Sequence, residues 1–149
     1  MFSCSHKICF FHFWIVKINA SGSLVWEESF GGTGIDEAYS VVEAESNNFM
    51  ILGKTFSDDV DVSHNIGQAD AWLIKIDSNG TLLWEKTYGG SSFDSGHAIT
   101  NSQDGGYIIT GSSRSQDGDL SVNNGQNDVF ILKISATGDV QRGYSFGGT

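Results

Sequence analysis

The sequence predicts an all-β protein built from consecutive four-stranded antiparallel sheets, and three observations predict it. A strict 58-residue repeat brings Trp14, Trp72 and Phe130 to one equivalent position. The chain has 19 glycines and no proline, which suits short strands joined by tight turns. Its apolar runs are short, and none shows helical periodicity. A fixed period of this size is typical of repeat architectures and outweighs any shorter motif.

The first strand pair of each repeat is marked by its turn. Asp77-Ser78-Asn79-Gly80 recurs as Asn19 to Gly22 and as Ser135 to Gly138. The first position can accept hydrogen bonds from its own turn, and the final glycine supplies the positive φ that such turns need. The same turn in three copies therefore predicts three β-hairpins.

The second strand pair contains a recurring glycine. Gly53 and Gly111 stand at the same repeat position inside apolar strands, which predicts a close backbone approach or a bulge. The turn Ser46-Asn47-Asn48 precedes the first of these strands, and asparagine tolerates the left-handed region. Strands are expected near 13–19, 23–30, 38–44, 49–56, 70–77, 82–88, 96–102, 107–113, 128–135 and 140–146.

Several strands are apolar on both faces, as in Trp72-Leu73-Ile74, so each is expected to lie between two layers. Four-stranded antiparallel units covered on both faces are the blades of a β-propeller. We therefore expect consecutive blades of an incomplete β-propeller that does not close on itself. The expected domains are a non-repeat leader at 1–12, a half-blade of two strands at 13–35, and blades at 36–93 and 94–149.

Two sets of repeated side chains have structural and functional interpretations. The four tryptophans at repeat-locked positions are predicted to form core between blades, with a sugar-binding face as the alternative. The lysines are predicted to extend along apolar surface to water, with glutamate pairing as the alternative. The tryptophans are Trp14, Trp26, Trp72 and Trp84, the lysines are Lys17, Lys75 and Lys133, and the possible glutamate partners are Glu27 and Glu85.

Composition limits the partners. The formal net charge is −10, from 18 acidic and 8 basic residues, so neither nucleic acid nor an anionic membrane surface is an expected partner. No apolar segment is long enough to span a bilayer. Cys4 and Cys9 stand near His6 and His12, which leaves a metal site or an irregular extension as interpretations.

The repeat pattern resembles a known class. Asp70 to Gly90, Asp94, and Asp104 to Gly111 carry a pattern similar to the propeller-type repeats of secreted and surface-anchored bacterial proteins. Such repeats are common in Bacteroidetes-like exported proteins that end in a sorting domain. The resemblance covers about residues 13 to 149. It implies an extracellular or cell-surface location and a piece of a longer protein, and it implies no particular activity.

The polar loops that precede the expected strands at 70–77 and 128–135 are the candidate ion site. Oxygen-bearing side chains occupy alternate positions in both copies, and calcium prefers six to eight oxygen ligands. The alternative is that these residues only form turns on a solvated loop. The candidate ligands are Asp59, Asp61, Ser63 and Asn65 in one copy, and Asp117, Asp119, Ser121 and Asn123 in the other.

Two functions from different classes follow. The first is a non-catalytic secreted or cell-surface module that binds a protein or a glycan, or acts as a scaffold, in contact with further blades or with other copies. The second is part of a propeller enzyme, quinoprotein-like or polysaccharide-active, whose active site lies on other blades. No catalytic motif occurs, and none of the four histidines recurs at the repeat period. The first function is therefore expected, with calcium as the one candidate cofactor.

Overall fold

A computed structural model describes residues 11–120, 123 and 125–148. These residues form ten β-strands and two short 3-10 turns, with no α-helix among them. The strands are β1 (Phe13–Ile18), β2 (Leu24–Phe30), β3 (Asp36–Glu43), β4 (Phe49–Thr55), β5 (Asp70–Ile76), β6 (Leu82–Tyr88), β7 (Asp94–Asn101), β8 (Tyr107–Ser113), β9 (Asp128–Ile134) and β10 (Val140–Phe146). The 3-10 turns are η1 (Glu45–Asn47) and η2 (Gly118–Leu120).

All ten predicted strands are confirmed, each within two residues of its expected bounds. The metal alternative at Cys4, His6 and Cys9 lies outside the described residues, as does most of the predicted leader. No helix in the described part of the chain is long and apolar enough to cross a membrane.

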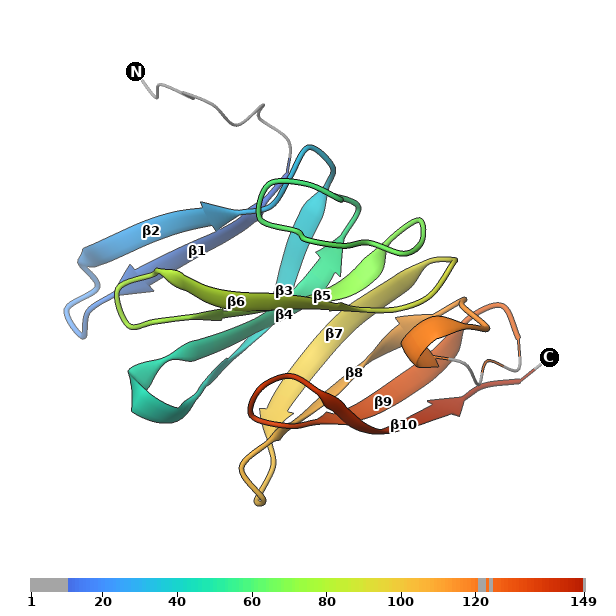
Figure 1. Ribbon diagram of the computed structural model, residues 1–149. Coiled ribbons are helices and arrows are strands. Elements are labelled where there is room, and N and C mark those ends of the chain that lie inside the picture. The colour runs from blue at the N-terminus through green and yellow to red at the C-terminus, as the bar shows by residue number, and fades with distance from the viewer. Residues whose placement is uncertain (1–10, 121–122, 124, 149) are drawn as a thin grey trace.

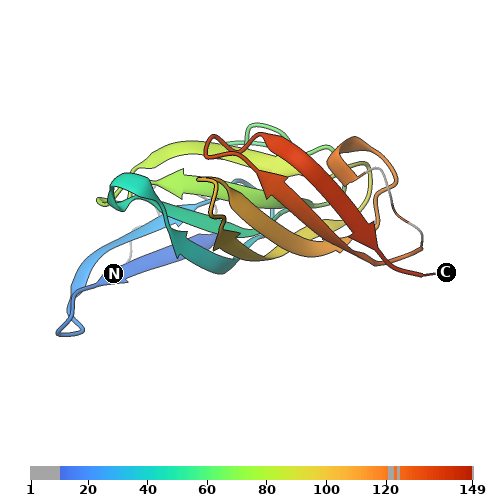
Figure 2. The same cartoon turned by 90° about the horizontal axis from the view of Figure 1, so that it is seen from below.

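The strands form one two-stranded and two four-stranded antiparallel sheets. Their orders are β1-β2, β3-β4-β5-β6 and β7-β8-β9-β10, so each sheet follows the chain without a crossover. Figures 1 and 2 show an open stack in which the β3–β6 sheet lies between the β1–β2 hairpin and the β7–β10 sheet. The predicted antiparallel four-stranded units are present, and the sheets do not close into a ring.

The two four-stranded sheets repeat the same register. Gly53 pairs with Trp72 in the first sheet, and Gly111 pairs with Phe130 in the second. A Cβ on Gly53 would clash with the carbonyl oxygen of Glu37, which explains why the strand has glycine here. The register shifts on the neighbouring strand at this point, so the predicted close approach and the bulge both occur.

The turns behave as their sequences predict. Gly22, Gly80 and Gly138 have φ between 81° and 87°, a region that other residues rarely adopt. Ser46 and Asn47 also have positive φ, within η1. The turns at Gly22, Gly80 and Gly138 therefore share one geometry, whereas the β3–β4 turn, with η1, differs from the β7–β8 turn, where Gly105 has positive φ.

Two clusters of buried side chains hold the stack together. One lies between the two four-stranded sheets and includes Leu52, Leu73, Phe130 and Leu132. The other lies between the β1–β2 hairpin and the β3–β6 sheet and includes Phe13, Ile51 and Trp72. Since β5 contributes to both clusters, it is buried along its whole length. This confirms the prediction that such a strand lies between two layers.

Candidate functional site

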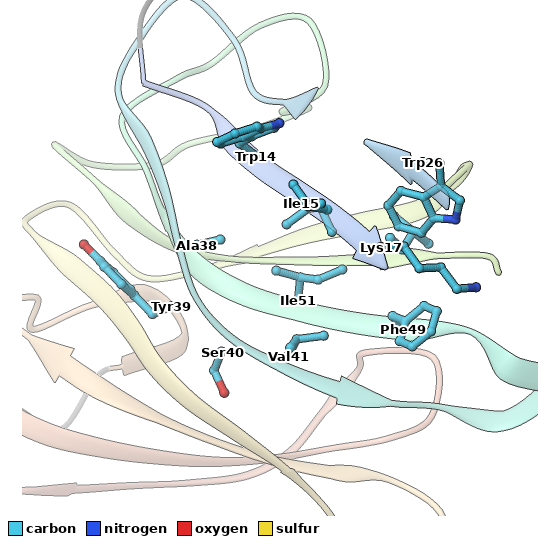
Figure 3. Close-up of a pocket in the computed structure, with 12 residues that line it drawn as sticks. Trp14, Ile15, Lys17, Trp26, Ala38, Tyr39, Ser40, Val41, Phe49 and Ile51 are labelled. Atoms are coloured by element: carbon cyan, nitrogen blue, oxygen red, sulfur yellow. The ribbon is translucent and has the colours of Figure 1, made fainter. Parts of the chain in front are cut away.

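An apolar groove lies between β1 and β3. It has a volume of about 390 Å³ and is open to solvent. Figure 3 shows β1 along one wall, with Trp14 and Ile15, and β3 along the other, with Ala38 to Val41. Ile51 and Phe49 of β4 form the floor between them. The groove exists because the first sheet has only two strands among the described residues, so β3 has no strand of that sheet beside it.

The four tryptophans do not share one environment. Trp72 is fully buried, its ring centroid lies 4.5 Å from that of Phe13, and its indole N–H donates to Glu85 at 2.8 Å. Trp14, at the equivalent position, is 69% exposed, so the prediction that it is core is wrong. The reason is that none of the sheets formed by the described residues covers the outer face of β1. Trp26 and Trp84 are half-buried against the two clusters.

The repeated lysines are paired, and each has a different partner. Lys75 is 6% exposed and pairs with Glu45. Lys133 pairs with Asp104 at 2.7 Å, and Lys17 donates to the carbonyl of Ser78 at 2.8 Å. The prediction that Lys75 extends to water is wrong, as is its alternative pairing with Glu85. The acidic partner lies instead in the turn that leads into β4.

The candidate calcium ligands bind backbone amides. The carboxylate of Asp59 accepts from the N–H of Thr33 at 2.8 Å, and that of Asp117 accepts from Ser91 at 2.7 Å, one repeat later. Asp61 accepts from the N–H of Gly31 at 3.0 Å. These bonds tie each polar loop to the Gly-Gly turn of the preceding strand pair.

The remaining described candidate ligands also make hydrogen bonds that hold the polar loops in place. Ser63 donates to Glu85 at 2.5 Å, and the amide side chains of Asn65 and Asn123 donate to the carbonyls of Thr55 and Ser113. Asp119 is held by its backbone N–H, which donates to Gly89 at 3.0 Å. Ser121 lies outside the described residues. No group of three or more His, Cys, Asp or Glu within the described residues is placed to hold a metal. The calcium site stays a prediction.

Sequence reasoning missed a buried aspartate network. Asp36 has no exposed surface and accepts from Thr55, Ser57 and the N–H of Gly32, at 2.5 to 3.0 Å. Asp94, one repeat later, accepts from Ser113, Ser115 and Gly90. The 58-residue period, applied to the polar positions as well as the apolar ones, would have found both sets.

A second buried aspartate, Asp70 at the start of β5, lies close to Asp94 from the neighbouring sheet. Asp70 has no exposed surface and accepts from the N–H of Ile66 at 2.9 Å, while its Oδ1 has no hydrogen-bond partner. A Cβ on Gly89 would contact both Asp70 Oδ1 and Asp94 Oδ2, so the two carboxylates lie close together. In the first copy His12 takes this position, and its Nδ1 lies 3.4 Å from Asp36.

The pKa of Asp70 is raised to about 6, chiefly by burial; the N–H of Ile66 opposes this rise and the nearby charge of Asp94 contributes to it. Burial also raises the pKa of Asp119, at the same junction between sheets. Nothing in this cluster holds a nucleophile or a base aimed at an open cavity. The aspartates therefore order the turns between sheets, and the apolar groove between β1 and β3 is the candidate binding site.

Comparisons with known proteins bear on the fold alone. No protein-family model matches the chain, and no curated protein matches it. Among solved structures, the chain is similar to a protein of unknown function from Bacteroides caccae, with a TM-score of 0.51 and 15% identity. The similarity covers 87% of this chain and 35% of that one, so the chain spans only part of that protein's length. At this identity the similarity shows an all-β fold of antiparallel sheets.

Proposed function

We propose that this chain is a non-catalytic β-propeller repeat module of a secreted or cell-surface protein, which binds a protein or glycan partner or acts as a scaffold. One observation carries the proposal: the 58-residue repeat folds twice into the same four-stranded sheet, and the two copies stack with one face of the first sheet against the opposite face of the second. Repeated sheets of this kind provide a rigid platform, and repeat proteins commonly use the surfaces of such platforms for binding.

The polar residues support a structural use of the repeat. The buried aspartates, threonine and serines that recur are bonded to each other and to backbone amides, within the interior of the stack. An enzyme places ionisable groups around a cleft that a substrate can enter. The groove between β1 and β3 is mostly apolar, which suits binding better than acid–base chemistry.

Exposed apolar surface supports contact with further blades or with other copies. Trp14 and Ile18 on β1, and Val129 and Phe146 on the last two strands, are all more than half exposed. Large exposed apolar side chains gathered on one face mark interaction surfaces in soluble proteins.

Two measurements test the proposal. The purified chain is first incubated with a panel of insoluble polysaccharides and a glycan array, and with chromogenic glycoside substrates. Binding without turnover supports a binding module, whereas turnover above that of a heat-denatured control would favour the propeller-enzyme alternative. Fractionation of the cells that produce the chain gives the second test. We expect it outside the cytoplasm, and recovery in the cytosol would contradict a secreted or surface role.

A further inference from the structure

We infer that the groove between β1 and β3 is a docking site for a β-hairpin supplied by a second polypeptide, with the sequence pattern of β3–β4. The hairpin extends the two-stranded sheet at the free edge of β1 and covers β3. This inference names the partner class for the proposed binding module and rests on that proposed function.

The first step concerns the edge of β1. β5 stands one repeat after β1, and it pairs with β6 on one side and with β4 along its whole length on the other. β1 pairs with β2 alone among the described residues. Within residues 11–120, 123 and 125–148, its other edge therefore has no strand beside it, and such an edge is a template for an added strand.

The second step concerns the facing wall. Val41 on β3 is 59% exposed, whereas Ile99, at the same repeat position on β7, is 6% exposed. Ile99 is buried because it packs in one cluster with Met50 and Leu52 of β4. Ser40 and Glu43 of β3 add hydrogen bonds to β7, from Ile99 and Asn101. The contacts that bury β7 thus come from the β3–β4 hairpin. No hairpin among the described residues packs against β3 in the same way.

The third step fixes the register. Gly53 of β4 lies opposite Trp72, and the repeat equivalent of Trp72 is Trp14. A docked hairpin of the β3–β4 type therefore places its glycine opposite Trp14. Its Leu52 then lies over Ala38, the repeat equivalent of Gly96. A Cβ at Gly96 would lie 2.7 Å from Leu52 Cδ1, so the docked leucine shifts away from the methyl group of Ala38. The docked hairpin would reproduce, one repeat earlier, the packing of β3 and β4 against β7 that the chain already forms between its two four-stranded sheets.

The test uses the full chain and a synthetic peptide of residues 36–57, labelled with fluorescein at its N-terminus. We expect the fluorescence anisotropy to rise with chain concentration and to saturate. A peptide with Leu52→Asp is the matched control. We expect this change to weaken binding by about tenfold or more, because it buries an unpaired carboxylate against Ala38.

Two chain variants locate the site. Val41→Asp changes the groove wall, and Val129→Asp makes the same change on the opposite end of the stack, where the side chain is 51% exposed. Both positions are exposed, so both variants are expected to fold, and their melting temperatures check this. We expect Val41→Asp to lose about tenfold or more in affinity and Val129→Asp to bind as the wild type does. Equal binding by the two variants would overturn the inference.

Hydrogen exchange of the peptide complex shows which strand edge of the chain pairs with the peptide. We expect the amides of β1 to gain protection and those of β2 to gain none, because β1 is the repeat equivalent of β5, which pairs with β4. No saturable binding, or protection gained on β6 or β10 instead, would overturn the inference. The polysaccharide and fractionation tests use the chain without peptide, so failure of hairpin docking and failure of the proposed function remain distinguishable.

Discussion

At the scale of single residues, Trp72 shows that the contribution of a repeat position to stability depends on its burial. Its ring is fully buried between the hairpin and the β3–β6 sheet, packed at a tilt against Phe13, and its N–H donates to Glu85. We expect Trp72→Ala to lower the free energy of unfolding by about 3 to 5 kcal/mol, since it leaves a large cavity.

The matched control for this prediction is Trp14→Ala, the same change one repeat earlier. Trp14 is 69% exposed, so we expect a loss within about 0.5 kcal/mol. Urea denaturation of the two variants measures the difference. Equal losses would mean that the outer face of β1 is covered in solution, as it would be in a self-associated state.

Asp70 gives a prediction about pH. Its pKa in the folded protein, about 6, lies above the ordinary value of 3.8, so the folded state binds the proton more tightly than the unfolded chain does. The stability that this proton provides is complete below about pH 4 and is lost as the pH rises to 6. We expect Asp70→Asn, which cannot ionise, to raise the free energy of unfolding at pH 8 by on the order of 2 kcal/mol.

Calorimetric scans of Asp70→Asn and the wild type at pH 4, 6 and 8 check this. The difference in melting temperature between the two proteins should be small at pH 4 and grow towards pH 8. Asp61→Asn is a useful comparison, because Asp61 accepts a backbone N–H from Gly31. A constant difference across this pH range would show that Asp70 does not carry the pH dependence.

At the scale of the elements, the strands were predictable and their surroundings were not. Alternating and continuous apolar runs, bounded by recurring glycine turns, predicted all ten strands, because strand formation here depends on local pattern and turn chemistry. The exposure of Trp14 was missed, since burial depends on which neighbouring sheet is present and not on the repeat position. Lys75 was also misassigned, because its partner Glu45 lies thirty positions away in the sequence, in a turn without a counterpart motif.

The groove itself could not be predicted from the apolar pattern. β1 and β5 have similar sequences, yet in the part of the chain that the structure describes β5 has a strand on both sides and β1 has one on a single side. The polar network was missed for a different reason: Asp36, Thr55 and Ser57 were taken as strand and loop ends, where polar residues are ordinary. Only their shared 58-residue spacing with Asp94, Ser113 and Ser115 distinguishes them from other loop residues.

The polar loops give a prediction about calcium. If Asp59 and Asp117 ligate an ion, millimolar calcium should raise the melting temperature by mass action, and magnesium should do so less. The variants Asp59→Asn and Asp117→Asn should remove the shift. Isothermal titration without heat, together with an unchanged melting temperature, would leave these carboxylates only as acceptors for the N–H groups of Thr33 and Ser91.

At the scale of the whole molecule, the two ends of the stack are complementary. The outer face of β1 carries Trp14 and Val16, whose equivalents Trp72 and Ile74 are fully buried against the preceding strand pair. The far face of the β7–β10 sheet carries Val129, at least half exposed, whose equivalent Ala71 is buried against the following sheet. The far face of one copy can therefore cover the β1 face of the next, as the sheets within the chain cover each other.

This contact between copies is head-to-tail, because it joins the far face of one copy to the β1 face of the next. Every assembly therefore keeps one free far face and one free β1 face at its ends. We expect the chain to associate as its concentration rises, and we expect Trp14→Glu and Val129→Glu each to be monomeric in sedimentation velocity. An equimolar mixture of the two variants should form dimers and nothing larger, because each variant retains the face that the other lacks. A wild-type chain that stays monomeric at high concentration, or a mixture without dimers, would contradict the head-to-tail contact and leave both end faces available for other partners.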